Sequence, residues 1–361
     1  MVFEKTVKPL LQKFFEGENV SIFAYGQTCT GKTYTIGTDA QDIPNFDLLP
    51  STAGIIPRAL YAIFNHQSEP DVEYAYRATF LEVYNEECRD LCNKSQRLFI
   101  RETLNGFVVN GLSRYRVTSM ADCLSVLSRG GKLRQTDATK MNVASSRSHA
   151  IFSLILTKTY GHTHSKFGNT DTIKINFIDL AGSERLNRTL AIGDRAKEGI
   201  AINKSLLALS NVINALAEKR VFVPYRDSCL TMLLKDSLCG KAYTLMISCI
   251  SPESEDYSET ISTLQYANRA KNIKLQPLKR CNSAPANLME ELLKQNTELK
   301  AKLVAMHNKE KAKPDVSSIV ELAECEITEL VQLVTELENA LCVRHKVLDK
   351  FCRHRMKVRF F

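Results

Sequence analysis

Residues 20–33 read VSIFAYGQTCTGKT, and they join an apolar run to a glycine-flanked loop. The run 20–25 is β-branched and aromatic and has the length of a strand. Residues 26–33 have the spacing G-x-x-x-x-G-K-T, in which backbone N–H groups wrap phosphates, the lysine reaches the outer phosphates and the hydroxyl holds Mg²⁺. A strand, a glycine turn and a helix N-terminus form an anion site. The stretch therefore predicts a P-loop inside an α/β fold.

The alternative is a turn that only resembles a P-loop. Such a turn keeps Gly26 and Gly31 for its geometry but has no need of Lys32 and Thr33. The first hypothesis is therefore a nucleoside triphosphatase that uses Mg²⁺. The residues predicted to hold the nucleotide are Gly26, Gln27, Thr28, Cys29, Thr30, Gly31, Lys32 and Thr33.

Composition favours one large domain with an appendage, because 44% of the 361 residues are hydrophobic and 24% are charged. No stretch approaches the roughly 20 apolar residues of a membrane span, and the start MVFEKTVKPL lacks a signal-peptide core, so we expect an intracellular protein without a membrane partner. The eleven cysteines include no CxxC pair, which favours reduced thiols over a zinc site. The net charge of +8 allows nucleic acid, an acidic protein surface or plain solubility.

Residues 1–274 alternate strand-like and helix-like runs. EYAYRATFLEVY, AIFSLILTKTY, TIKINFIDL and AYTLMISCI are typical of strands, whereas NKSLLALSNVINAL is typical of a helix. This alternation predicts helices layered around a central, mostly parallel or mixed sheet, which is the fold class of P-loop NTPases.

The character of the chain changes after residue 274. Residues 275–287 contain two prolines and no helical period, so they are predicted to be a linker. Apolar residues at spacings of three and four predict a short coiled coil over 288–308 and a second over 319–351, separated by a break over 309–318 and followed by a basic tail over 352–361. These coils predict a homodimer. The alternative is two amphipathic helices that fold back on the globular part.

Two further motifs could sense the γ-phosphate. NVASSRSH at 142–149 offers hydroxyls at Ser145 and Ser146, followed by a cation at Arg147. DLAGSE at 179–184 ends a strand with an acid and then has a flexible glycine and a second acid. Taken singly, a serine cluster is usually a cap or turn, and an acid at a strand end is usually a helix start. The candidate acids and glycine are Asp179, Gly182 and Glu184.

The order of these three motifs resembles that of a kinesin motor domain. The strings G-Q-T-x-x-G-K-T, N-x-x-S-S-R-S-H and D-L-A-G-S-E of that family match 26–33, 142–149 and 179–184, and the similarity extends over nearly all of 3–274. The amino-acid sequence around SRSHAIFSLIL, AIGDRAKEGI and FVPYRDS is most similar to the chromokinesin (kinesin-4) branch.

The resemblance implies ATP hydrolysis coupled to microtubule binding. It also implies a location in the cytoplasm on the cytoskeleton, at the spindle or in the nucleus. Binding to nucleic acid or chromatin is suggested by family analogy alone. It implies a salt bridge between Arg147 and Glu184, a γ-phosphate sensor at Gly182, and Mg²⁺ placed by Ser146 beside Thr33. Tyr34 takes the position of a residue that stacks on adenine, and a core tyrosine is the alternative. NKSL at 203–206 is half of a GTPase motif but lies in a helical leucine pattern, so ATP is favoured.

The sequence departs from the family in three places. Kinesin motors carry roughly sixty further residues before this start, including a central strand, so we expect a fragment, an incomplete gene model or a shortened isoform in which the YTLMISCIS strand has an unpaired edge. Cys229 and Met232 replace two cations of the tubulin-facing string YRDSCLTMLL. Arg195, Lys197 and Arg226 remain as candidate contacts, and an ordinary solvated face is the alternative for each. In the neck linker, Leu275 and Arg280 stand where asparagines are expected.

Three hypotheses follow. The first is a microtubule-dependent motor ATPase, dimeric through its coiled coils. The second is a non-motile microtubule-binding or dominant-negative protein with impaired ATP turnover, suggested by the missing segment and the altered neck. The third is a nucleic-acid-binding ATPase, suggested only by the net charge and the end CRHRMKVRFF. Stimulation of ATP hydrolysis by microtubules, or by DNA or RNA, separates the three.

Overall fold

A computed structural model describes residues 2–38, 49–67, 69–93, 96–103, 106–139, 147–160, 170–184 and 194–273; for 135–139 and 194–203 it describes the backbone alone. The chain divides into two compact units, Met1–Lys279 with Val358–Phe361, and Arg280–Lys357. All described residues belong to the first unit. The predicted linker, both coiled coils and the basic tail lie outside the described residues, so they stay predictions.

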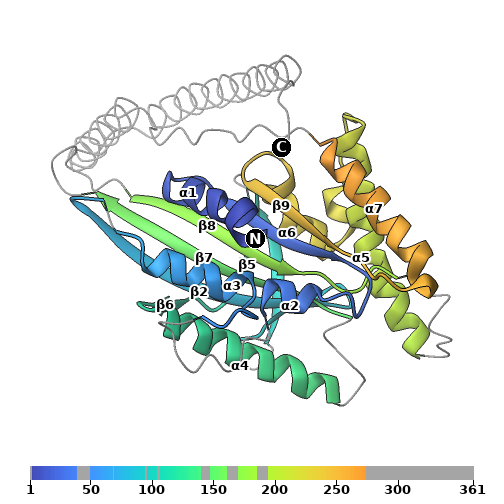
Figure 1. Cartoon of the computed structure of the whole chain (residues 1–361), viewed down its shortest axis with the longest axis horizontal. Helices are drawn as coiled ribbons and strands as arrows, with labels where there is room; N and C mark the ends of the chain where they lie inside the picture. The colour runs from blue at the N-terminus through green and yellow to red at the C-terminus, as the bar shows by residue number, and fades with distance from the viewer. Residues whose placement is uncertain are drawn as a thin grey trace, which may run out of the picture. The chain divides into compact units, whose positions relative to one another are not determined.

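A nine-stranded mixed sheet forms the centre of the first unit (Figure 1). Its order is β5-β4-β3-β2-β7-β8-β1-β9, with β6 paired to β2. β1 pairs in parallel with both β8 and β9, whereas β7 pairs antiparallel with β2 and β8. The strands are β1 (Val20–Gly26), β2 (Val72–Tyr84), β3 (Glu87–Asp90), β4 (Gln96–Thr103), β5 (Gly106–Asn110), β6 (Tyr115–Val117), β7 (His149–Tyr160), β8 (Thr170–Asp179) and β9 (Tyr243–Cys249).

Helices cover both faces of this sheet. One buried cluster joins the sheet to α1, α3 and α4, and a second joins it to α5, α6 and α7; α7 lies alongside α5 (Figure 1). The predicted α/β fold is therefore confirmed. The helices are η1 (Phe3–Val7), α1 (Lys8–Phe15), α2 (Lys32–Ile36), α3 (Ile55–Phe64), α4 (Met120–Thr139), α5 (Asp194–Ala217), η4 (Tyr225–Asp227), α6 (Cys229–Leu238), η5 (Ser254–Asp256) and α7 (Tyr257–Lys271).

Strand β1 shows why its sequence is almost continuously apolar. Successive side chains of a strand point to opposite faces, and Ile22 packs in the cluster of α1, α3 and α4 while Phe23 packs in the cluster of α5, α6 and α7. Ser21 is the polar exception, and its hydroxyl bonds the Ser237 hydroxyl of α6 at 2.7 Å. Because both faces are covered, the alternation of polar and apolar residues disappears.

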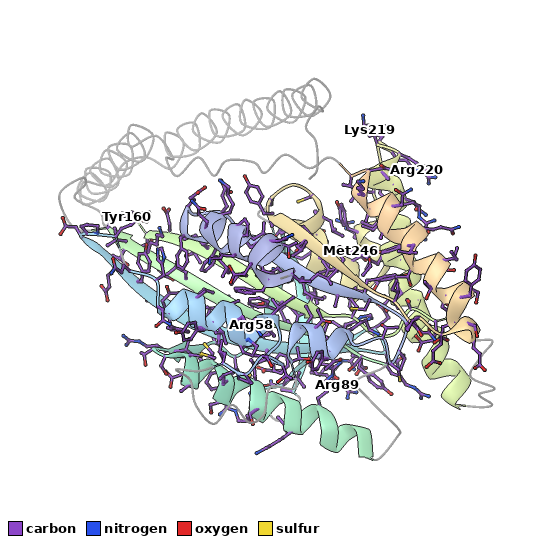
Figure 2. All side chains as sticks on the ribbon, in the orientation of Figure 1. Arg58, Arg89, Tyr160, Lys219, Arg220 and Met246 are labelled. Atoms are coloured by element: carbon purple, nitrogen blue, oxygen red, sulfur yellow. The ribbon has the colours of Figure 1, made fainter. Side chains whose placement is uncertain are left out.

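Strand β9 is the open edge of the sheet. Within the described residues it pairs only with β1, and six of its seven residues are half-buried. Met246, labelled in Figure 2, is partly buried and packs against the cluster of α5, α6 and α7. The predicted unpaired edge of YTLMISCIS is confirmed, and such an edge can pair with another chain.

None of the described helices combines the length and the apolar character that a membrane crossing requires.

Replacing Phe177 with alanine is expected to lower the free energy of unfolding by about 3–5 kcal/mol. Its ring is fully buried and packs against Phe152, with 6.4 Å between ring centroids. Urea unfolding followed by circular dichroism measures the change. Phe222→Ala is the matched control, because Phe222 is 77% exposed and should lose less than about 0.5 kcal/mol. Equal losses would contradict this assignment of the core.

Candidate functional site

The predicted P-loop follows β1 and is shaped by its two glycines. Gly26 has φ 150°, and a Cβ there would lie 2.0 Å from the Cys249 carbonyl oxygen of β9. Gly31 has φ 86° and is the N-cap of α2. Larger residues at these two positions would clash or strain the backbone. The geometry that the loop requires therefore explains both glycines.

Helix α2 begins where the motif predicts a helix N-terminus, and it is short. It has five residues and ends at Gly37, which has φ 82°. A single turn contributes little macrodipole, so the loop N–H groups and the lysine are the main positive features of this site. Lys32 is 6% exposed, and its Nζ donates to the Gln27 carbonyl oxygen at 2.7 Å. Burial lowers the pKa of the Lys32 amine, and the nearby carboxylates of Asp179 and Glu184 oppose this shift.

Asp179 meets the P-loop because β8 and β1 are parallel neighbours. Asp179 lies beside Ala24 in the register, so the ends of both strands share one edge of the sheet. Its Oδ2 accepts hydrogen bonds from the hydroxyls of Thr33 at 2.8 Å and Thr38 at 3.2 Å. Its Oδ1 is buried and has no hydrogen-bond partner in the described part of the chain. Hydroxyl and carboxylate oxygens are ligands that Mg²⁺ prefers, so Thr33 and Asp179 fit a magnesium site.

The segment 179–184 lies against the P-loop. The Ser183 N–H donates to the Gly26 carbonyl oxygen at 3.1 Å. The Glu184 carboxylate accepts from the Thr28 N–H at 2.9 Å and from the Thr28 hydroxyl. A Cβ at Gly182 would lie 2.2 Å from the Thr28 hydroxyl oxygen. A side chain at position 182 would therefore displace the Thr28 hydroxyl and the Glu184 carboxylate, which bond each other in the structure.

A buried arginine of α4 completes the ionic environment of Asp179. Arg134 is 4% exposed and forms ion pairs with Asp179 at 3.3 Å and Glu82 at 3.5 Å. It also donates to the Ser148 carbonyl oxygen at 2.9 Å. The role of Arg134 could not be predicted from the sequence, because an arginine in a polar helical stretch looks ordinary and its partners are distant along the chain.

The comparisons with known proteins decide the family. The family model described as "Kinesin motor domain" matches residues 1–273. This chain belongs to the kinesin motor domain family. It is 43% identical over 294 residues to kinesin-like protein kif7 of Danio rerio, covering 79% of this chain and 21% of that protein. It is also 43% identical over 317 residues to chromosome-associated kinesin KIF4 of Xenopus laevis, covering 85% of this chain and 25% of that protein.

Solved kinesins share the fold. The chain is 39% identical to a fast kinesin, with a TM-score of 0.70 and 79% of each chain covered. It is 42% identical to a KIF14 dimer solved with AMP-PNP in complex with a microtubule, with a TM-score of 0.69 and 81% of each chain covered. Chromosome-associated kinesins are thus among the relatives, as the sequence predicted, while kinesins outside that branch match at similar identity. The chain spans 21–25% of the length of its first relatives.

Two candidate serines of this kinesin, Ser145 and Ser146, lie outside the described residues. Arg147 is described, and its predicted bridge to Glu184 stays a prediction. The Glu184 carboxylate accepts hydrogen bonds from Thr28. Arg226 forms an ion pair with Glu102. The side chains of 195 and 197 lie outside the described part.

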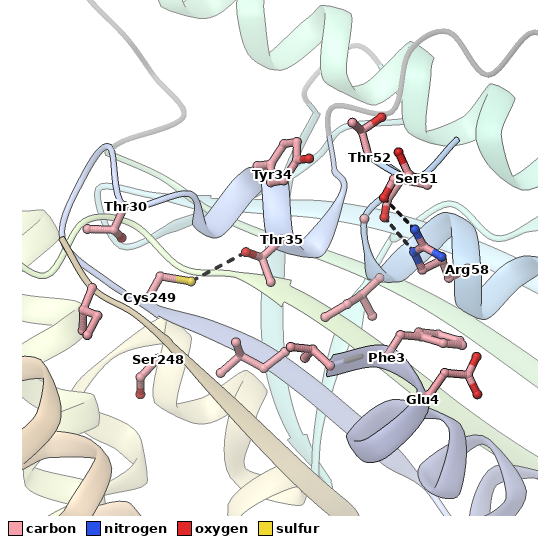
Figure 3. A pocket seen from close by; sticks show the side chains of 16 residues that line it. Phe3, Glu4, Thr30, Tyr34, Thr35, Ser51, Thr52, Arg58, Ser248 and Cys249 are labelled. Atoms are coloured by element: carbon pink, nitrogen blue, oxygen red, sulfur yellow. Dashed lines mark hydrogen bonds between the residues drawn. The ribbon is translucent and has the colours of Figure 1, made fainter. Parts of the chain in front are cut away.

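Tyr34 is not a core residue, because it is 66% exposed. It lies beside a pocket of about 590 Å³ between α2, η1 and the end of β9 (Figure 3). Thr35 and Cys249 meet on the pocket wall at 3.8 Å. Arg58 fastens the rim of the pocket by donating to the carbonyl oxygens of Ser51 and Ala53. The predicted stacking of Tyr34 on adenine stays a prediction.

His149 joins three parts of the site, a role that the sequence did not reveal. It begins β7, its Nδ1 accepts from the Ala181 N–H at 3.0 Å, and its Nε2 bonds the Ser205 hydroxyl of α5 at 2.8 Å. Burial, with Arg134 and Lys32 nearby, lowers the pKa of His149 to about 3. The neutral imidazole therefore connects the segment 179–184 to α5 at physiological pH.

Lys32→Ala is expected to reduce ATP hydrolysis by about 100-fold or more, because no other P-loop side chain can reach the outer phosphates with a positive charge. The fold should be retained, because the substitution removes a charge that is costly to bury. A coupled phosphate-release assay measures turnover, and circular dichroism checks the fold. Lys5→Ala is the matched control, because Lys5 is exposed on η1. Unchanged turnover in folded Lys32→Ala protein would rule out the P-loop assignment.

Lowering the pH is expected to destabilise the fold through His149. Its pKa is about 3 when folded and about 6.5 when unfolded, so below pH 6.5 only the unfolded state gains this proton and stability falls with the pH. The loss between pH 7 and pH 5 is about 2 kcal/mol from this group. Urea unfolding at both pH values measures it. His149→Gln should reduce this pH dependence by that amount, whereas His66→Gln, at an exposed position, should retain most of it.

Proposed function

We propose that this kinesin chain hydrolyses ATP and couples hydrolysis to movement along microtubules. The observation that carries the proposal is the contact of the segment 179–184 with the P-loop. Asp179 bonds Thr33, and Glu184 bonds Thr28. A phosphate bound by the loop would therefore lie within reach of the segment that must respond to it.

Each residue has a defined role in this proposal. Lys32 reaches the outer phosphates of ATP, and Gly182 senses the γ-phosphate through its backbone. Thr33 and Ser146 hold Mg²⁺, with Asp179 beside them. When bound, Mg²⁺ neutralises charge on the β- and γ-phosphate oxygens. Tyr34 stacks on the adenine from the rim of the pocket.

The proposed closure involves Glu184 through both the P-loop and Arg147. The Glu184 carboxylate accepts hydrogen bonds from Thr28 in the structure, and a carboxylate has acceptor sites for an arginine as well. Because Gly182 and Glu184 lie only two residues apart, a shift at the phosphate sensor moves the acid and its contacts as well.

Movement at the nucleotide is proposed to reach the microtubule through His149 and α5. His149 contacts both Ala181 and Ser205, so a displacement of the segment 179–184 bears on α5. Helix α5 packs against α6 and α7. We propose that α5 and the string 225–234 face tubulin, with Arg195, Lys197 and Arg226 as the basic contacts.

The whole protein is proposed to act on microtubules of the cytoskeleton. A KIF14 dimer with 42% identity was solved in complex with a microtubule, which supports the same partner here. Dimerisation through 288–308 and 319–351 belongs to the same proposal and rests on the heptad pattern alone.

A second function, that of a non-motile microtubule-binding protein, is favoured by one observation. Strand β9 forms an open edge beside the P-loop, and the Cys249 carbonyl oxygen of β9 contacts Gly26. Within the described residues, β9 has backbone hydrogen bonds to one strand, β1, whereas β1 is bonded to both β8 and β9. If β9 shifts, the P-loop shifts with it, and ATP turnover falls while microtubule binding remains.

Steady-state ATP hydrolysis of the whole chain, with and without microtubules at low salt, separates these functions. A motor should be stimulated about tenfold or more, which corresponds to about 1.4 kcal/mol of barrier. Lys32→Ala protein supplies the background rate. Co-sedimentation with microtubules without stimulation, from a folded sample, would overturn the motor and support the passive binder. Stimulation by DNA instead would contradict both.

A further inference from the structure

Two cysteines that are distant in sequence meet where α6 begins. Cys88 lies on β3, and Cys229 is the first residue of α6. Both are free thiols. Cys88 is buried in the cluster of α5, α6 and α7, and Cys229 packs against the same cluster. In the sequence, Cys229 had marked only a lost cation.

Hydrogen bonds around the pair hold the two backbones in place. The Glu86 carboxylate, in the turn between β2 and β3, accepts from the Ser228 hydroxyl and from the Cys229 N–H, both at 2.8 Å. The Cys229 thiol lies 2.9 Å from the Glu86 carbonyl oxygen. Ser228 also caps α6 by accepting from the Leu230 N–H at 3.1 Å. The turn and the helix start are therefore fastened to each other beside the thiols.

The two thiols differ in access and in acidity. Cys88 is 2% exposed, whereas Cys229 is half-buried and can be reached from solvent. The hydrogen bond from Cys88 lowers the pKa of the Cys229 thiol, against burial and the Glu86 carboxylate, and the same hydrogen bond and burial raise the pKa of Cys88. A thiol at a helix N-terminus gains further stabilisation of its thiolate. Of the two thiols, Cys229 is thus the one expected to react first with an oxidant.

We propose that Cys88 and Cys229 are a redox modification site that forms a reversible disulfide with hydrogen peroxide. The Cys229 thiolate attacks one peroxide oxygen, the O–O bond breaks, and the sulfur becomes a sulfenic acid as hydroxide leaves. The hydroxide takes the Cys88 proton and becomes water. The Cys88 thiolate then attacks the Cys229 sulfur, and the sulfenic oxygen leaves as a second water after it gains a proton. Two thiols lose two electrons in total, and one peroxide is reduced to two waters.

The position of the pair gives the bond a structural consequence. A disulfide would join β3 covalently to the first turn of α6. The Glu86 contacts already hold the start of α6 against the turn that precedes β3, so the bond would join two segments that are in contact. The chemistry requires neither ATP nor microtubules, so its outcome is independent of the proposed motor activity.

Peptide mass spectrometry of the whole reduced chain tests the proposal. The chain is treated with one equivalent of hydrogen peroxide, and the remaining thiols are blocked with N-ethylmaleimide before digestion. The expected product is a Cys88–Cys229 peptide pair that lacks two hydrogens, with two fewer blocked cysteines per chain. Dithiothreitol should restore both. A product in which this peptide pair is a minor species among random cross-links would overturn the proposal.

Three serine variants assign the roles. Cys88→Ser should abolish the cross-link and leave a Cys229 sulfenic acid, raising its labelling by dimedone about tenfold. Cys229→Ser should leave buried Cys88 unmodified. Cys239→Ser is the matched control at the other end of α6, where the thiol is also half-buried and burial raises its pKa, and it should retain the cross-link. Equal dimedone labelling of Cys229 with and without Cys88, in variants shown to be folded by circular dichroism, would show that Cys88 does not resolve the sulfenic acid.

Discussion

The parallel pairing of β8 with β1 is the constraint on which the nucleotide site depends. Parallel neighbours end at the same edge of a sheet, so the acid that ends β8 lies beside the loop that follows β1. Thr33 and Asp179 are 146 residues apart in the chain, yet the Thr33 hydroxyl oxygen and Asp179 Oδ2 lie 2.8 Å apart. A shift of one residue in this register would turn the Asp179 side chain to the other face of the sheet.

Buried charges make the same edge sensitive to change. Lys32 and Arg134 are each less than a tenth exposed, and so are Glu82 and Asp179. Arg134 pairs with both carboxylates in a region of low dielectric, where loss of the guanidinium would leave uncompensated charges. Within the described residues, the buried Asp179 Oδ1 has no hydrogen-bond partner, so this oxygen can accept a further positive group. The acid that ends β8 is thus held in place and keeps one oxygen for a ligand.

Local sequence predicted the elements well where periodicity was strong. The run VSIFAY is β1, the run AIFSLILTKTY lies within β7, and NKSLLALSNVINAL lies within α5. The half-motif NKSL is helical, as its leucine pattern indicated. Arg134 and His149 escaped prediction, because their partners are distant in the sequence and a polar residue in a helix or at a strand start looks ordinary. The sequence predicted that a helix begins at the P-loop, as α2 does, and only the structure shows that Gly37 ends it after five residues.

The sequence by itself determined the kinesin family and the P-loop, because the identity and spacing of residues along the chain carry both. Only the tertiary structure decided which side chains share the site: Arg134 with Asp179, Glu184 with Thr28, His149 with Ser205, and Cys88 with Cys229. These pairs depend on sheet register and on how helices pack across it, and contacts between such distant positions leave no periodic trace in one sequence.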